Sequence, residues 1–264
     1  MKSLRKYWAI LTTQAVNSLA YPAELFWRSL VIILFMWIFG QLWRLTFAAA
    51  GTSVISGLTL HDTLWYLMLA ETIELSRPRL ARTIGEAVRD GSIAYLLNKP
   101  YNFLLYQLSN NLGESLFRML LNALFGGAAV WLMVGPPPDP RGWPLAAVAV
   151  LGAWLINYCI GALLGLAAFV SEEVAPFEWI YQKMIFILGG MLIPLDFYPA
   201  WLQAIAKALP FAYAMYGPAR LFVSPDLGRF ASLVAGQLAW ILVLGGLLVL
   251  AYGRGIRRLA INGG

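Results

Sequence analysis

Long apolar stretches separated by short polar connections dominate the pattern of this chain. A helix that crosses a bilayer needs about 20 apolar residues, and six stretches approach or reach that length. These predicted spans are residues 24–45, 58–75, 111–134, 144–170, 179–194 and 230–252. A seventh span over 201–211 is rejected because that segment is short and contains Lys207 and Pro210. We therefore expect one all-α polytopic membrane domain over residues 1–264, with six transmembrane helices.

The first 21 residues carry a different pattern, in which apolar and polar side chains alternate at helical spacing. The apolar positions are Leu4, Tyr7, Trp8, Leu11, Ala15 and Leu19. Such an amphipathic helix is suited to lying along a membrane surface, and an ordinary N-terminal helix is the alternative. No uninterrupted apolar core or cleavage site follows, so we do not expect a signal peptide in residues 1–21.

The connection over residues 76–100 is too long and too charged to be a simple turn. Its residues 79–88 predict a short helix, and Gly91 supplies a stop signal of the kind found at helix C-termini. Charged side chains on and after this helix can face a partner in the cytosol, or can simply keep the loop out of lipid. They are Arg82, Glu86, Arg89 and Asp90.

The connection over residues 195–229 is apolar and rich in aromatic residues. Four prolines cut it into pieces that are too short to span a bilayer: Pro199, Pro210, Pro218 and Pro225. This pattern predicts re-entrant or interfacial helices, and a belt of aromatic side chains at the headgroup level is the alternative.

Composition supports the membrane interpretation and excludes several functions. Hydrophobic residues make up 60% of the chain and charged residues 12%, whereas soluble domains contain roughly 25% charged residues. The single cysteine and single histidine cannot form a disulfide framework or a His/Cys zinc site. The dipeptide Gly-Lys is absent from the sequence, so the chain has no phosphate-binding loop of the G-x-x-x-x-G-K-[ST] type. We expect no catalysis, metal or cofactor in this chain.

The basic residues predict the orientation of the chain. One side of the predicted topology holds Lys2, Arg5, Lys6, Arg77, Arg79, Arg82, Arg89, Lys99, Arg254, Arg257 and Arg258. The other side holds only Arg141, Lys207, Arg220 and Arg229. Because positive charge accumulates in the cytosol, both termini are predicted to be cytoplasmic. The net charge of +6 thus reflects topology, and no nucleic-acid partner is needed to explain it.

Ionisable residues inside predicted spans are functional candidates because burying them in lipid is costly. Glu71 and Glu74 lie near the inner end of the second span. They can attract a cationic substrate, or they can pair with basic residues, and we favour the pairing. The partners considered are Arg79, Arg82 and Arg118. Two other acid–base pairs have the four-residue spacing of one helix face: Glu24 with Arg28, and Glu114 with Arg118.

The third and fourth spans carry polar and small residues that promote helix packing. Asn122 and Asn157 are intramembrane amides, usable as contacts between helices or as substrate contacts. Ala153, Asn157, Gly161 and Gly165 recur every four residues, which lets another helix approach closely. The pattern does not decide whether that neighbour belongs to this chain or to a second membrane protein.

The fifth predicted span contains a break. Gly189 and Gly190 are followed by Pro194 within an apolar segment, and such residues interrupt or kink a helix. Broken helices near the membrane midplane recur in transporters, while a kink that serves packing alone is the alternative.

These features together resemble a known family. The loop sequence IGEAVRDGSIAYLLNKP after the second span and GGMLIPLDFYPAWLQAIAKALPFAY after the fifth accompany the amphipathic N-terminus. The pattern resembles the membrane subunits of type-2 ABC exporters, and more narrowly bacterial six-span permeases whose ATPase is a separate polypeptide. The resemblance covers essentially the whole chain.

The resemblance implies partners and roles. It implies a homo- or heterodimer of permeases in the bacterial cytoplasmic membrane, bound to two cytosolic ATPase subunits that hold ATP and magnesium. Residues 1–21 correspond to an interface helix, and 195–229 to outer re-entrant helices. The family's coupling helix corresponds in this chain to the segment that contains Arg82, Glu86, Arg89, Asp90 and Gly91. The resemblance assigns no substrate residues, but we expect spans one, two and five to line the substrate pathway. The residue patterns described above give the possible pathway residues on these and the neighbouring spans: Glu71, Glu74, Asn122, Asn157, Gly189, Gly190 and Pro194.

Two other function classes remain open from the sequence. An ion-coupled secondary transporter would use Glu71 and Glu74 as a relay, but it predicts inverted repeats, and none is convincing between residues 1–130 and 131–264. A membrane-embedded enzyme or assembly scaffold is the other class, and a single histidine argues against an enzyme.

Overall fold

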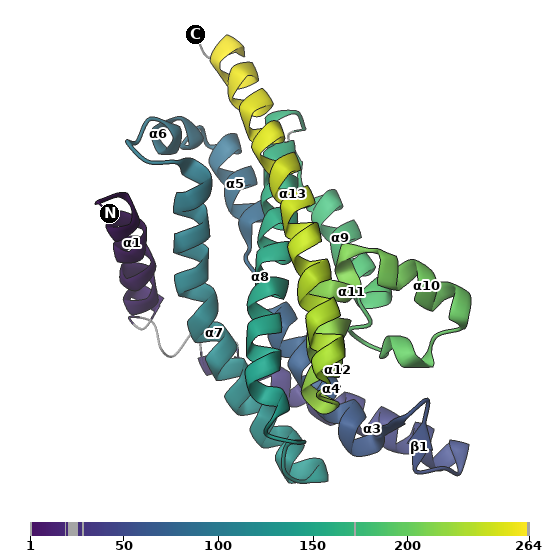
Figure 1. The fold of residues 1–264 in the computed structure, drawn as a ribbon. Helices are drawn as coiled ribbons and strands as arrows, with labels where there is room; N and C mark the ends of the chain where they lie inside the picture. Colours follow the sequence, from purple (N-terminus) through teal and green to yellow (C-terminus); the bar gives the residue numbers. More distant parts are fainter. Residues whose placement is uncertain (1, 19, 21–25, 28, 172, 263–264) are drawn as a thin grey trace.

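The computed structural model describes residues 2–18, 20, 26–27, 29–171 and 173–262 of the chain. Most of these residues are helical, and the long helices run lengthwise beside one another in an elongated bundle (Figure 1). The predicted pair of Glu24 and Arg28 lies outside the described residues.

Within the described part of the chain, four helices are long and apolar enough to cross a membrane. They are α3 (Val31–Ala50), α7 (Phe103–Val134), α8 (Gly142–Leu166, extended by η1, Ala167–Phe169) and α13 (Leu227–Asn262). They correspond to the first, third, fourth and sixth predicted spans, with shifted ends. The helix α7 begins at Phe103 rather than at 111, because the side chain of Asn102 caps it by accepting a hydrogen bond of 3.0 Å from Leu105 N.

The second and fifth predicted spans form shorter helices. These are α4 (Leu60–Leu75) with 16 residues and α9 (Ala175–Leu188) with 14. At 1.5 Å per residue they measure about 24 and 21 Å, less than the roughly 30 Å of a hydrocarbon core. The helix α4 is nevertheless central, because α3, α7 and α12 (Tyr216–Val223) pack around it. It is the most enclosed of the bundle helices, with Tyr66, Leu67 and Ala70 fully buried.

A short β-hairpin precedes α4 and was not predicted. The strands β1 (Val54–Ile55) and β2 (Leu58–Thr59) pair antiparallel, with Ile55 opposite Leu58. The turn between them places Ser56 at φ 49° and Gly57 at φ 77°, as in a type I′ hairpin turn. The first two residues of the predicted second span therefore belong to a strand. The helix begins after Thr59, whose side chain forms a capping box with Asp62.

The N-terminal helix α1 (Lys2–Ser18) covers most of the segment predicted to be an amphipathic helix. It runs alongside the first part of α7 (Figure 1). Near its start, the hydroxyl of Tyr7 accepts a hydrogen bond of 3.1 Å from Asn102 N. Further along, the backbone of Leu11 and Ala15 lies against Gly113. This contact is possible because Gly113 has no side chain to hold the two backbones apart.

Short helices replace a membrane crossing between α9 and α13. They are α10 (Ala200–Ala208), α11 (Pro210–Ala214) and α12, preceded by the single turn η2 (Leu195–Phe197). Pro199 is the N-cap of α10, Pro210 opens α11, and Pro218 lies in the first turn of α12. The prolines thus divide this segment into short helices, as the sequence predicted.

The two ends of the bundle differ in character. One end carries the hairpin and the turn from α7 to α8, and we call it the hairpin end. The other carries α5 (Leu80–Arg89), α6 (Ile93–Leu97) and the last turns of α13, and we call it the α6 end (Figure 1).

Candidate functional site

The helix α5 presents two different faces at the α6 end. Leu80, Ala81, Ile84, Gly85 and Ala87 are buried, and the charged residues of the helix are exposed. The exposed set is Arg82, Glu86, Arg89 and, after the last turn, Asp90 and Gly91. The chain turns away at Gly91, whose φ of 78° strongly favours glycine. The structure thus brings the five predicted coupling residues together on one accessible surface.

The buried face of α5 packs against the glycine-containing face of α8. A Cβ atom added to Gly165 would lie 2.9 Å from the Cβ of Ile84, and one added to Gly161 would lie 3.7 Å from the Cβ of Leu80. The small residues predicted to admit a neighbouring helix therefore admit α5 of this chain. Van der Waals contact over this length couples α5 closely to α8.

The connection between α8 and α9 joins the same surface. Gly85 of α5 packs against Val174, where an added Cβ would approach Val174 Cγ2 to 2.6 Å. Beside it, Arg89 Nη2 lies 3.2 Å from Glu173 Oε1, in an ion pair that is about two-thirds exposed. Two connections that are distant in sequence thus form one continuous surface at the α6 end.

The exposed charges on this surface have ordinary local partners. Arg82 Nε lies 2.8 Å from Glu86 Oε1, and both side chains are mostly exposed. The hydroxyl and backbone N–H of Ser92 lower the pKa of Asp90 below its usual range. Asp90 is therefore ionised at neutral pH. The surface offers both signs of charge within about two helical turns.

A cavity of about 480 Å³ opens between α3, α4 and α9. Its wall is apolar toward the middle of the bundle and charged toward the α6 end. The apolar lining includes Phe35, Phe39, Phe186, Met191 and Leu192, and the polar lining is Glu71, Glu74, Arg77, Arg79, Arg82, Glu178 and Gln182. Two of the candidate pathway residues, Glu71 and Glu74, therefore line one cavity.

The two carboxylates differ in their partners. Glu74 Oε1 lies 2.8 Å from Arg77 Nε, and both side chains are mostly buried. Glu71 is 5% exposed, and its Oε2 atom has no hydrogen-bond partner among the described residues. The partner found for Glu74 is thus Arg77 rather than the residues considered from the sequence. Arg118 lies 3.4 Å from Glu114, as the spacing predicted.

The two candidate amides act as contacts between elements. Asn122 of α7 donates a hydrogen bond of 3.1 Å to the hydroxyl of Ser76, just after α4. Asn157 of α8 accepts a hydrogen bond from the hydroxyl of Tyr181 in α9. Its amide nitrogen donates to Ala153 O at 3.1 Å. Both amides therefore bond across the bundle, one of the two roles expected for them.

The predicted break in the fifth span is present. The helix α9 ends at Leu188, Gly190 has a φ of 71°, and the chain is non-helical until Pro194 opens η2. The hydroxyl of Tyr66 in α4 donates a hydrogen bond of 2.7 Å to Gly190 O. A backbone carbonyl freed by the break thus finds a partner inside the bundle, as burial away from water requires.

Sequence reasoning missed several residues that complete these sites. Tyr66 and Tyr181 lie within predicted spans and were not singled out, although buried tyrosines usually hydrogen-bond through the hydroxyl. Glu173 lies between the fourth and fifth predicted spans and was not singled out either. Glu173 lies beside α5 because α8 packs against α5, and local sequence patterns do not predict which helices pack together.

Comparison with known proteins identifies the family. The family model described as "ABC-2 family transporter protein" matches residues 31–263. The chain belongs to the ABC-2 transporter family. No match was found among curated proteins. Members of the ABC-2 family are membrane components of ABC transporters and are not themselves ATPases. The membership also implies association with ABC ATPase subunits.

Proposed function

We propose that this ABC-2 family protein is the permease subunit of an ABC exporter, working as a dimer with separate cytosolic ATPase subunits. The observation that carries the proposal is the surface of α5. Its outer side is exposed and charged, while its inner side packs against α8 through Gly161 and Gly165. A partner that moves α5 must therefore also move α8 or break this contact.

The proposed orientation places the α6 end in the cytosol of a bacterium, in its cytoplasmic membrane. The excess of basic residues on that side supports it. In this orientation α5 is the coupling helix, and its contacts with the ATPase are Arg82, Glu86, Arg89, Asp90 and Gly91.

Coupling follows from the contacts of α5. A push from the ATPase passes to α8 through the glycine contact, and to the α8–α9 connection through Gly85 and Val174. It passes to α4 along the short link from Ser76 to Arg79. Because α4 and α9 both line the cavity, movement of α5 changes the shape of that cavity. The protein thus switches access of the substrate path between two states that differ in these contacts.

A second permease is proposed to close the open side of the cavity. The helices α3 and α9 flank it and expose large apolar side chains. These include Leu34, Trp37, Ile38, Trp179, Ile180 and Ile187. Either lipid or another permease covers such a surface in a membrane, and the carboxylates between the two helices favour a protein partner over acyl chains.

The decisive experiment separates docking from general effects of charge. In E86K/R89E two of the four exposed coupling charges are reversed, and the ATPase subunit is expected to co-purify at least tenfold less with the permease. The matched control is D139K/R141E, which reverses an exposed pair at the hairpin end, where Arg141 Nη2 contacts Asp139. The control is expected to retain the ATPase. Normal assembly and normal substrate-stimulated ATPase activity in E86K/R89E would exclude α5 as the coupling helix.

One observation favours the alternative of an ion-coupled transporter. Glu71 is a buried carboxylate with an oxygen for which the described residues supply no hydrogen-bond partner, and such groups serve in proton relays. Transport in vesicles distinguishes the two functions. The exporter requires ATP and continues when an ionophore removes the ion gradients, whereas the secondary transporter stops.

A further inference from the structure

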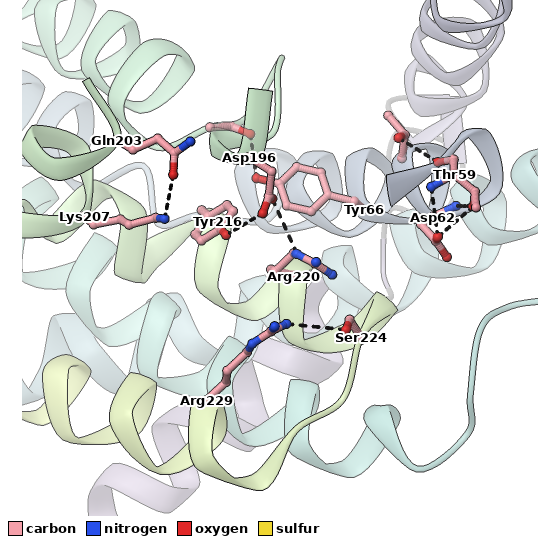
Figure 2. Close-up of polar contacts among 12 residues, drawn as sticks. Thr59, Asp62, Tyr66, Asp196, Gln203, Lys207, Tyr216, Arg220, Ser224 and Arg229 are labelled. Atoms are coloured by element: carbon pink, nitrogen blue, oxygen red, sulfur yellow. Dashed lines mark hydrogen bonds and ion pairs between the residues drawn. The ribbon is translucent and has the colours of Figure 1, made fainter. Parts of the chain in front are cut away.

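A second cavity lies toward the hairpin end, and its lining is basic. It measures about 450 Å³ and lies between α10, α12 and α13. Three cationic side chains line it, Lys207, Arg220 and Arg229, against one carboxylate, Asp196. Figure 2 shows these side chains gathered from three different helices and from the turn η2. The cavity therefore carries a surplus of positive charge.

The innermost part of this cavity holds a cluster of polar side chains that contact one another. Arg220 Nε lies 3.4 Å from Asp196 Oδ2, and the two side chains are 13% and 18% exposed. The hydroxyl of Tyr216 donates to Asp196 Oδ1 at 3.2 Å. The contact with Asp196 is made through Nε, and no hydrogen bond of the terminal nitrogens of Arg220 is found among the described residues. The N–H groups of those nitrogens can therefore serve another acceptor.

The other two cations have only neutral partners among the described residues. Lys207 Nζ donates to the amide oxygen of Gln203 at 2.8 Å and lies 5.7 Å from the centre of the Tyr216 ring. Arg229 Nη1 donates to the hydroxyl of Ser224 at 3.4 Å. The carboxylate of Asp226 accepts from the backbone N–H of Arg229 instead, at the start of α13. Both cations are exposed at the rim.

We propose that this cavity binds an oxyanion of the phosphate type, which Lys207 and Arg229 contact at the rim and Arg220 contacts from within. Guanidinium and ammonium groups from separate helices match the several oxygens of a phosphate. The remaining wall is largely apolar and includes Ala212, Leu221 and Leu233, and Ser232 and the two tyrosines Tyr213 and Tyr216 complete it. It suits the chain of an amphiphile whose headgroup carries the anion. The same cations also fit free phosphate, and the test below distinguishes the two sources.

The test uses the full-length chain purified in dodecyl maltoside and titrated in a calorimeter. The probes are dihexanoyl phosphatidic acid, inorganic phosphate and, as a zwitterionic control, dihexanoyl phosphatidylcholine. Phosphatidic acid is expected to bind more tightly than phosphatidylcholine. In K207Q/R229Q its Kd is expected to rise about tenfold or more, because at least one charge-assisted hydrogen bond is lost. The matched control R141Q removes an exposed cation at the same end of the bundle and is expected to leave Kd unchanged.

Each outcome bears on the proposal. Equal binding of inorganic phosphate and phosphatidic acid assigns the cavity to the free anion, and binding of phosphatidic acid alone assigns it to an amphiphile. The proposal is overturned if neither anion binds, if phosphatidylcholine binds as tightly as phosphatidic acid, or if K207Q/R229Q binds like the unmodified chain. An equal loss in R141Q also overturns it, because attraction would then be non-specific. The Tm of each variant without ligand checks that the fold is retained.

Discussion

At the contact between α5 and α8, the missing side chain of one glycine determines how closely the two helices approach. An added methyl group at Gly165 would lie 2.9 Å from both Ile84 Cβ and Ile84 Cδ1, whereas at Gly161 the nearest atom is 3.7 Å away. The first distance is a clash, and the second is ordinary contact. These two glycines on one helix face therefore form a natural pair for comparison.

Gly165→Ala is expected to destabilise the protein, and Gly161→Ala is not. Overpacking a close contact costs about 1–3 kcal/mol, which for G165A appears as a Tm lowered by several degrees in detergent. G161A is expected to stay within about 1 kcal/mol of the unmodified chain. A Tm for G165A equal to that of G161A would contradict the close approach of α5.

The break after α9 depends on Gly190 in a similar way, but through the backbone. Its φ of 71° is disfavoured for other residues, and an added Cβ would lie 2.9 Å from Leu195 Cγ. Gly190→Ala is expected to cost about 1–3 kcal/mol. Gly245→Ala in α13 is the control, since no atom of the residues that the structure describes lies within 4 Å of an added Cβ there. That change is expected to leave Tm unchanged or slightly raised, because alanine favours a helix.

The two cavity carboxylates are expected to respond differently to neutralisation. Glu74→Gln leaves Arg77, 15% exposed, without its carboxylate, at a cost of about 1–3 kcal/mol. Glu71→Gln removes a carboxylate whose Oε2 has no hydrogen-bond partner in the described part of the chain, so no loss of stability is expected. Thermal unfolding of the two variants in the same detergent tests this, and an equal fall in Tm would show that Glu71 is also paired.

At the scale of elements, the ion pair between Arg89 and Glu173 joins α5 to the α8–α9 connection. The pair is exposed, so it contributes only about 0.2–1 kcal/mol to stability. Arg89 has two candidate ion-pair partners: Glu173 within the chain and an acidic group of the proposed ATPase.

Charge reversal separates these two roles of Arg89. R89E is expected to weaken substrate-stimulated ATPase activity in the reconstituted complex, because it places a negative charge on the docking surface. The double change R89E/E173R restores an ion pair within the chain. No recovery is expected in that variant if Arg89 contacts the ATPase directly, whereas full recovery would mean that Arg89 acts only by holding Glu173.

Element positions were more predictable than element lengths. The apolar stretches and the prolines at 199, 210 and 218 are local signals, and the structure has helices at all six predicted spans and short helices after the prolines. The starts of α7 and α4 differ from the prediction because the cap from Asn102 and the hairpin that ends at Thr59 interrupt otherwise continuous patterns. The contact of α5 with α8 required knowledge of which small-residue face meets which helix. Spacing alone cannot provide it.

For the whole molecule, the single cysteine makes the proposed orientation directly testable. Cys159 is buried, so it gives little background to a membrane-impermeant maleimide. Thr83→Cys on the exposed face of α5 is expected to react only after cells are opened, whereas Arg141→Cys at the hairpin end is expected to react in intact spheroplasts. Labelling of T83C from outside would reverse the proposed orientation.

The candidate sites were only partly predictable at this scale. Glu71 and Glu74 were found because charge inside an apolar stretch is conspicuous, and Gly189–Gly190 because glycine pairs interrupt helices. The basic cavity escaped notice because Lys207, Arg220 and Arg229 are scattered over α10, α12 and α13. In the sequence these three residues are isolated charges in a connection, and only the fold brings them together.

The enclosure of α4 also has a consequence for how the chain is made. The helix α4 has 16 residues and carries Asp62, Glu71 and Glu74. During synthesis we do not expect it to partition from the translocon into lipid by itself, because each charge opposes partitioning. It becomes acceptable once α3 and α7 surround it. We therefore expect ribosome-bound chains that stop before α7 to hold α4 unstably in the membrane. Insertion of α4, which lines the substrate path, therefore depends on the order in which the helices emerge from the ribosome.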